Sequence, residues 1–117
     1  MKIKDYKWRI FIADLNPVKG SEQRGNRPIL AISDEDFNHV MPVITILPVT
    51  SLRQGRRVYP NEVLLPKGIA GLVHDSLVLT HQIRTISKGR LQRALGIIED
   101  PKLLEAINNA LRIHLNL

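Results

Sequence analysis

The sequence predicts a mainly β protein of the α+β class, in which short antiparallel strands form a partly closed barrel and a helix ends the chain. Three observations support this fold. Short apolar, β-rich runs are separated by turn-forming residues over most of the chain, and a helix start follows them near residue 100. The chain has 117 residues, 44% of them apolar, which suits one domain with a buried core. We therefore expect a single domain over residues 1–117.

Two strands and a short helix are expected in the first third of the chain. Apolar residues alternate with their neighbours from Trp8 to Ile12, so one face of the first strand should lie in the core. Ser33 or Asp34 can cap the helix, which should end near His39. The two strands are expected at residues 8–15 and 28–33.

The remainder of the chain predicts further strands and a C-terminal helix. The strands are expected at residues 42–50, at about 57–65 and at 76–86, followed by a turn or short helix at 88–92 and a last strand at 93–98. Asp100 can cap the final helix, and Pro101 stands where its missing N–H costs nothing. The helix should run to about His114, with one apolar face made of Leu103, Leu104, Ile107, Leu111 and Leu115.

The connection between the first two strands is the most informative part of the sequence. Residues 14–28 are about three times longer than a hairpin turn needs. Pro28 restricts Arg27 to an extended conformation, which places its guanidinium at the edge of the second strand. Gly20 and Gly25 either form turns with positive φ or cradle a phosphate. Polar and charged side chains crowd this loop: Lys19, Ser21, Glu22, Gln23, Arg24 and Asn26.

Three ordered groups of motifs stand out along the chain. They are Asp14-Leu15-Asn16-Pro17 with Lys19-Gly20-Ser21-Glu22-Gln23, Gly25 and Arg27-Pro28, then Pro48-Val49-Thr50-Ser51, and then Gln82-Ile83-Arg84-Thr85-Ile86. Their order and spacing resemble those of the MazF/PemK family of toxin ribonucleases, from about residue 8 to the C-terminus. The resemblance implies the SH3-like barrel shared by MazF, PemK and the gyrase poison CcdB, assembled as a two-fold dimer.

The resemblance also implies an activity. The implied activity is that of a sequence-specific endoribonuclease toxin of a type II toxin–antitoxin system. Such an enzyme cuts single-stranded RNA such as mRNA and leaves a 2′,3′-cyclic phosphate and a 5′-hydroxyl. RNA supplies its own nucleophile, the 2′-hydroxyl beside each phosphate, so we expect no metal and no cofactor. The expected partners are single-stranded RNA, a cognate antitoxin and a second copy of the chain.

Two positions in the motifs match those held responsible for cleavage in the family, Arg27 and Thr50. A guanidinium can hold a phosphate bidentately but is a poor proton acceptor, so we expect Arg27 to stabilise charge, or also to protonate the leaving oxygen. Glu22 is the third catalytic candidate. It either acts as general base or orients the 2′-hydroxyl, or it pairs with Lys19 or Arg24 and only holds the loop.

The other candidates are expected to bind RNA. The arginines that follow Thr50 either contact flanking phosphates or bases, or form a solvated run of charge. The RNA-binding candidates are Lys19, Ser21, Gln23, Arg24, Asn26, Ser51, Arg53, Arg56, Arg57, His81, Gln82 and Arg84.

The four histidines, at positions 39, 74, 81 and 114, show no short metal-ligand spacing, so no metal site is expected. His81 stands where parts of the MazF/PemK family have an Asp that contributes to the site. It either donates to phosphate when protonated or is a neutral, partly buried residue.

Charge and composition narrow the choice of ligand and compartment. Lys and Arg exceed Asp and Glu by 17 − 11 = +6, which favours a polyanion or reflects solvated charge without a ligand. The chain has no cysteine, which excludes a Cys nucleophile and fits a reducing cytosol. Because it shows neither an export signal nor an apolar run of about 18 residues, we expect a cytoplasmic protein without membrane contact.

Two other functions remain as alternatives. A CcdB-like gyrase poison would share the fold, but such proteins resemble one another in a Trp-containing C-terminus that this chain lacks. A non-catalytic RNA-binding barrel would need aromatic side chains on which bases can stack, and aromatic residues make up only 4% of the chain.

Overall fold

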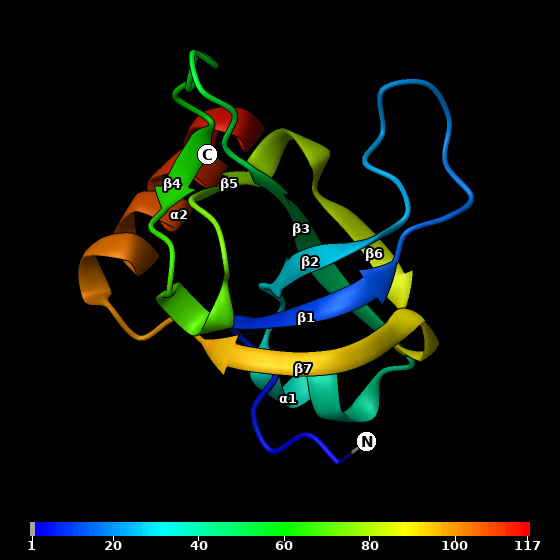
Figure 1. The fold of residues 1–117 in the computed structure, drawn as a ribbon. Coiled ribbons are helices and arrows are strands. Elements are labelled where there is room, and N and C mark those ends of the chain that lie inside the picture. Colours follow the sequence, from blue (N-terminus) through cyan, green and yellow to red (C-terminus); the bar gives the residue numbers. More distant parts are fainter. Residues whose placement is uncertain (1) are drawn as a thin grey trace.

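Seven antiparallel strands form one curved sheet in the computed structural model, which describes residues 2–117 (Figure 1). Their order is β4-β5-β3-β2-β1-β7, and β6 pairs with β3 outside this row. The strands are β1 (Arg9–Asp14), β2 (Asn26–Ala31), β3 (Val43–Ser51), β4 (Glu62–Leu65), β5 (Ser76–Leu79), β6 (Arg84–Ser87) and β7 (Leu91–Ile97). The sheet curls, but its end strands β4 and β7 do not pair, so the barrel is partly closed, as the sequence predicted.

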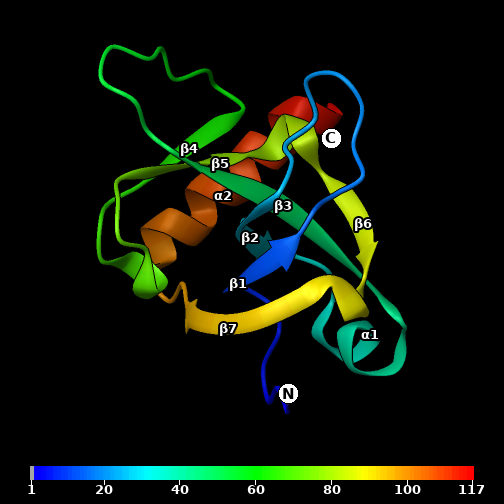
Figure 2. The same ribbon diagram turned by 45° about the vertical axis from the view of Figure 1, so that its right-hand side comes forward.

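Helices lie at opposite ends of this sheet (Figures 1 and 2). The long helix α2 (Pro101–Leu115) packs against β4, and the short helix α1 (Glu35–Val40) lies near the N-terminus. The connections contain short 3-10 turns, η1 (Ile69–Gly71), η2 (Thr80–Gln82) and η3 (Lys88–Arg90). Among residues 2–117, no helix is both long and apolar enough to cross a membrane.

Most elements expected from the sequence are present. The strands expected at 8–15, 28–33, 42–50 and 93–98 are confirmed, with ends shifted by one or two residues, and η3 forms the expected turn. Asp34, not Ser33, caps α1 by accepting hydrogen bonds from the N–H groups of Asp36 and Phe37. Asp100 caps α2 as expected, accepting from the N–H of Lys102.

The single strand expected at 76–86 is wrong, because this segment forms two strands. β5 pairs with the end of β3, where Ser76 lies opposite Ser51, and β6 pairs with the beginning of β3, where Ile86 lies opposite Ile44. The turn η2 between them redirects the chain. Thr80 is buried in this turn, and its hydroxyl donates to the carbonyl of Asn61.

The strand expected from about residue 57 begins only at Glu62. A turn precedes it, in which the N–H of Glu62 donates to the carbonyl of Tyr59 at 2.9 Å. Pro60 within this turn has no N–H to give to a neighbouring strand. Residues 52–61 are therefore a loop, which projects beyond β3 and β4 (Figures 1 and 2).

Both faces of the curved sheet are buried, whereas the sequence predicted one buried face for the first strand. Ile10 and Phe11 are both fully buried, and since successive side chains alternate, they enter different clusters. Ile10 packs in the cluster that contains Ile107 of α2. The expected apolar face of α2 is confirmed except at its end, where Leu115 is exposed because the last turn extends beyond this cluster.

Candidate active site

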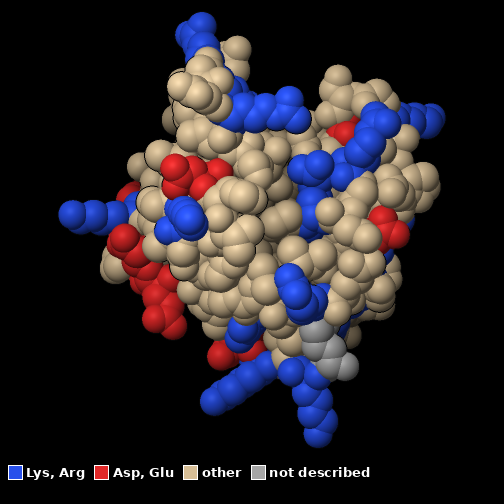
Figure 3. Space-filling model, viewed as in Figure 1, with Lys and Arg blue, Asp and Glu red and all other residues tan. Residues whose placement is uncertain are grey.

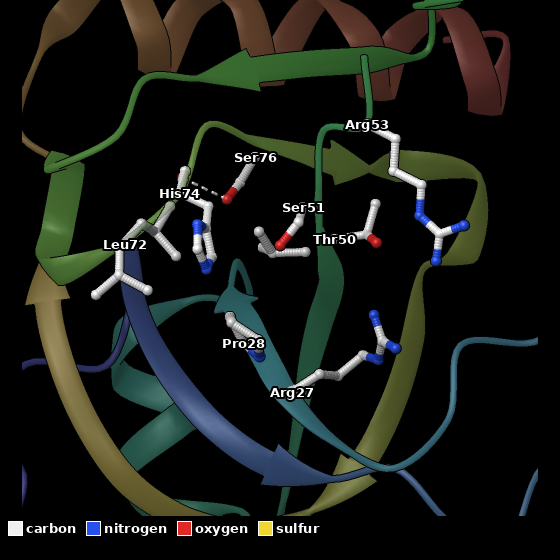
Figure 4. A pocket seen from close by; sticks show the side chains of 10 residues that line it. Arg27, Pro28, Thr50, Ser51, Arg53, Leu72, His74 and Ser76 are labelled. Atoms are coloured by element: carbon white, nitrogen blue, oxygen red, sulfur yellow. Dashed lines mark hydrogen bonds between the residues drawn. The ribbon is translucent and has the colours of Figure 1, made fainter. Parts of the chain in front are cut away.

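β2 and β3 separate at one end and leave a cavity between them. They pair only from Ile29 opposite Pro48 to Ala31 opposite Ile46. Pro28, the next residue toward the start of β2, has no N–H with which to continue the ladder. The resulting cavity has a volume of about 330 Å³. It is lined by Arg27, Pro28, Val49, Thr50, Ser51, Arg53, Leu72, Val73, His74 and Ser76 (Figure 4).

Arg27 and Thr50 enter this cavity from the two separating strands (Figure 4). The Nε–H of Arg27 donates to the carbonyl of Arg24 at 2.8 Å, which directs the guanidinium toward Thr50 and Arg53. The Arg27 side chain is partly buried, and this burial lowers the pKa of its guanidinium. The cavity thus combines two guanidinium groups with the hydroxyls of Thr50 and Ser51, a set of donors suited to phosphate oxygens.

A second cavity, of about 360 Å³, lies under the loop between β1 and β2. Glu22 lines it together with Ser21, His81, Gln82, Ile83 and Arg84. Glu22 is not among the residues that line the cavity of Arg27 and Thr50. Its carboxylate accepts a hydrogen bond from the backbone N–H of Lys19, so it holds the loop through the backbone and not through the Lys19 ammonium.

The loop between β1 and β2 is tied to the sheet by side chains from η2 and β6. The side-chain carbonyl of Gln82 accepts from the N–H of Gln23 at 2.9 Å, and its amide donates to the carbonyl of Ser21 at 3.0 Å. Arg84 donates to the carbonyl of Leu15 at 3.2 Å. Two residues expected to bind RNA are therefore already engaged in positioning the loop.

Within the loop, glycines and polar side chains fix the turns. Gly20 and Gly25 have positive φ angles of 55° and 77°, which supports the turn interpretation of these glycines. Arg24 donates to the carbonyl of Gly20 at 2.7 Å. Asn26 accepts from the amide of Gln92 at 3.2 Å. Lys19 and Ser21 are exposed on the same loop.

The arginines of the loop after β3 differ in their contacts. Arg56 makes a two-point ion pair with Glu62, with N–O distances of 2.9 and 2.7 Å, and the Glu62 side chain is only 1% exposed. The hydrogen bonds from Arg56 lower the pKa of Glu62. Arg53 lines the cavity, and Arg57 is exposed over the ring of Tyr59, 5.1 Å from its centroid. Arg53 and Arg57 can reach a ligand, whereas Arg56 stabilises the loop.

The structure corrects the expected environment of His81 and places His74 where no role was expected. His81 lies in η2 and is exposed, so the interpretation as a partly buried residue is wrong; its ring centroid is 6.3 Å from that of His114. His74 lines the cavity of Arg27 and Thr50, a place that the sequence did not predict. The missing information was the pairing of β5 with β3, which brings the segment before Ser76 beside Ser51.

One group of basic side chains lies on the side of the molecule that carries the loop between β1 and β2, and others project at the top, the left edge and the bottom of this view (Figure 3). The largest acidic group on this face lies on the other side, near the start of α2. Such an arrangement attracts a polyanion toward the loop and the neighbouring cavity. In the described part of the chain, no three His, Asp or Glu side chains are grouped so that they could share a metal ion.

Comparisons with known proteins agree on one family. The sequence model of the PemK-like, MazF-like toxin of type II toxin–antitoxin systems matches residues 6–115. Endoribonuclease MazF of Staphylococcus saprophyticus is 38% identical over 108 residues, which are 92% of this chain and 88% of the relative. The structure of MazF from Deinococcus radiodurans is 30% identical, with a TM-score of 0.74 over 95% of this chain and 96% of that one. A MazE–MazF structure from the same organism is 26% identical, with a TM-score of 0.72 over 100% and 99% of the two chains.

Proposed function

The chain belongs to the PemK-like, MazF-like toxin family of type II toxin–antitoxin systems, and we propose that it cuts single-stranded RNA at a short sequence by attack of the RNA's own 2′-hydroxyl. It is accordingly an endoribonuclease toxin. One observation carries the proposed mechanism: Arg27 and Thr50, which lie on different strands, line one cavity together with further phosphate-binding groups.

The reaction requires charge stabilisation and two proton transfers. A bond forms between the 2′-oxygen and phosphorus, and the bond from phosphorus to the 5′-oxygen breaks, so a proton leaves the first oxygen and another joins the second. Arg27 holds the phosphate and stabilises the charge that develops on it. Because burial lowers the pKa of Arg27, its guanidinium is also a better proton donor to the departing 5′-oxygen.

Thr50 supplies the second contact to the reacting phosphate. Its half-buried hydroxyl can donate to a non-bridging oxygen from a strand whose backbone pairs with β5, where Thr50 lies opposite Leu77. A donor held by a paired strand needs little rearrangement as charge develops in the transition state. The neighbouring Ser51 and Arg53 line the same cavity and would bind the flanking phosphates.

The remaining candidates lie on the loop between β1 and β2, on the loop after β3, and on η2 and β6, and would contact RNA beyond the cavity or position the first of these loops. Exposed side chains among them would contact phosphates and bases, whereas Gln82 and Arg84 would act chiefly by positioning the loop. For Glu22, the contact with the N–H of Lys19 favours holding the loop over proton abstraction. The proposed RNA contacts are Lys19, Ser21, Gln23, Arg24, Asn26, Arg57 and His81.

The proposed partners are a second copy of the chain and an antitoxin. Exposed apolar side chains that a partner could cover include Phe37, Val40 and Met41 at α1 and Ile113 near the end of α2. A MazE–MazF structure is among the relatives, which supports an antitoxin of the MazE kind for this chain. An antitoxin segment with acidic residues would compete with RNA for the basic side of the molecule. We expect RNA and the antitoxin to compete for the protein in the cytoplasm, where both are made.

A test of this function uses purified protein and a long unstructured transcript. The expected result is a set of fragments that share a short sequence at the cut and carry 5′-hydroxyl ends, which accept phosphate from polynucleotide kinase without prior phosphatase treatment. A substrate with one 2′-deoxynucleotide immediately before the cut should bind but stay intact, since phosphate contacts supply affinity while the nucleophile is missing. Cleavage of that substrate would replace the proposed mechanism by attack of water.

A further inference from the structure

We propose that His74 is the general base that removes the proton from the attacking 2′-hydroxyl. This inference rests on the proposed function, because it assigns a role within the same cavity. The cleavage reaction needs a proton acceptor, and neither Arg27 nor Thr50 supplies one near neutral pH. Among the described residues that line the cavity, His74 is the one whose side chain can take up a proton in that range.

The position of His74 is set by the sheet. Antiparallel pairing places Ser76 of β5 opposite Ser51 of β3, and His74 precedes this pair by two residues. The hydroxyl of Ser76 donates to the carbonyl of His74 at 2.8 Å and so restrains the backbone at this point. Ser76 is itself buried, while the His74 side chain is exposed to the cavity mouth. The imidazole is therefore accessible to a ligand and held on a restrained backbone.

The arrangement of the cavity fits an in-line displacement. In such a reaction, the attacking and leaving oxygens lie on opposite sides of the phosphorus atom. Figure 4 shows the imidazole of His74 on one side of the cavity and the guanidinium groups of Arg27 and Arg53 on the other, with Ser51 between them and Thr50 on the side of the arginines. A phosphate held by the hydroxyls of Ser51 and Thr50 would present its 2′-hydroxyl toward His74 and its 5′-oxygen toward Arg27.

The proton balance of the step follows from this placement. The neutral imidazole of His74 accepts the 2′-hydroxyl proton as the bond from the 2′-oxygen to phosphorus forms. The bond from phosphorus to the 5′-oxygen breaks, and Arg27 gives a proton to that oxygen. After the products leave, His74 returns a proton to solvent and Arg27 takes one back, so the enzyme is restored without a co-reactant.

The charged groups around His74 define the expected pH behaviour. Arg27 from β2 and Arg53 from the loop after β3 face the same cavity. On its own segment, Asp75 is turned to another contact, because its carboxylate accepts from the N–H of Lys67 at 2.8 Å. A base must be unprotonated to act, so the cleavage rate should fall toward acidic pH.

The test compares His74→Gln with the wild-type protein in single-turnover cleavage across pH 5–8. We expect a loss of about 10²-fold or more at the upper end of this range and the disappearance of the acidic fall in rate. His74→Gly should regain activity when imidazole is added, which a purely structural role would not allow. His39→Gln is the matched control, because His39 lies on α1 and outside the cavity, and it should keep the wild-type rate.

A substrate with sulfur in place of the 5′-oxygen identifies which proton His74 moves. Sulfur leaves without a proton, so the defect of His74→Gln should persist with this substrate. Restoration of the wild-type rate by the sulfur would make His74 an acid and overturn the assignment as base. A wild-type rate for His74→Gln would also overturn it, as would a loss of activity that matches a loss of folded protein by circular dichroism. If the proposed function itself is wrong, the wild-type protein would cleave the substrate that carries a 2′-deoxynucleotide before the cut.

Discussion

The backbone N–H of Gln23 donates a hydrogen bond of 2.9 Å to the oxygen of the Gln82 side-chain amide, although the residues are 59 positions apart. The same amide donates to the carbonyl of Ser21 at 3.0 Å. One side chain of η2 therefore satisfies two backbone groups of the loop between β1 and β2. The order of this polar loop depends on a contact with the sheet and not only on its own turns.

Loss of the Gln82 amide should loosen the loop without unfolding the protein. Each hydrogen bond contributes about 1 kcal/mol, so Gln82→Leu should lower the equilibrium constant between the ordered and the disordered loop by roughly 30-fold. We expect KM to rise about tenfold or more, with a smaller change in kcat, and trypsin to cut faster after Lys19 and Arg24. Asn109→Leu, at an exposed position of α2, is the control. An unchanged KM and trypsin rate would show that the two hydrogen bonds do not order the loop.

Removal of the Arg27 guanidinium should abolish most of the cleavage while preserving the fold. We expect Arg27→Ala to lower kcat by about 10³-fold, because it removes both charge stabilisation and the proposed proton donor. The free energy of unfolding should fall by only about 1 kcal/mol, since the guanidinium lies in the open cavity and its hydrogen bond goes to the carbonyl of Arg24. Chemical unfolding measured beside cleavage separates the two effects, and a large loss of stability would make Arg27 a structural residue.

The hydroxyl of Thr50 can be tested by a change that keeps its shape. Thr50→Val replaces the hydroxyl by a methyl group and retains the branched side chain that suits a strand. The cleavage rate should fall by about 10²-fold if the hydroxyl donates to the phosphate in the transition state. Ser51→Ala removes a neighbouring hydroxyl and should weaken RNA binding more than it slows cleavage. An unaltered rate for Thr50→Val would leave Thr50 with a packing role only.

The sequence predicted much of this site because its main parts are local. Alternating apolar residues marked β1 and β2, the Arg27-Pro28 pair marked the start of β2, and Thr50 stood at the end of an apolar run. His74 was not predicted, because nothing in its neighbourhood indicates that residues before β5 lie beside β3. The break at η2 was missed for the same reason: Thr80 has a strand propensity that long-range pairing of β5 and β6 with β3 overrides.

The ion pair of Glu62 with Arg56 should make stability depend on pH in the acidic range. The hydrogen bonds from Arg56 lower the pKa of Glu62 in the folded protein, so the unfolded chain binds a proton at Glu62 more readily. This contribution is fully present above the unfolded pKa of about 4.3 and is lost as the pH falls through the lower folded pKa. The free energy of unfolding, measured in urea from pH 7 to 3, should decline across that window.

Glu62→Gln should reduce that decline and also cost stability at pH 7. The substitution leaves Arg56 without its charged partner beside a buried side chain, at a cost of about 2–4 kcal/mol. Glu105→Gln is the matched control, because Glu105 pairs with Arg112 at 3.7 Å and its side chain is 65% exposed. The control should change stability by less than about 0.5 kcal/mol. Equal effects of the two substitutions would show that the ion pair of Glu62 with Arg56 does not cause the acid sensitivity.

Chelation of divalent metal ions should leave the cleavage rate unchanged. The cavity that holds the proposed catalytic groups presents the guanidinium groups of Arg27 and Arg53, which repel a divalent cation and themselves supply positive charge to the phosphate. The proposed nucleophile is the 2′-hydroxyl of the substrate, so the mechanism needs no metal-bound water. Cleavage measured on an unstructured oligonucleotide, whose own folding does not depend on Mg²⁺, should proceed at the same rate with and without excess EDTA. A loss of activity that added Mg²⁺ or Mn²⁺ restores would instead require a metal ion that binds together with the RNA.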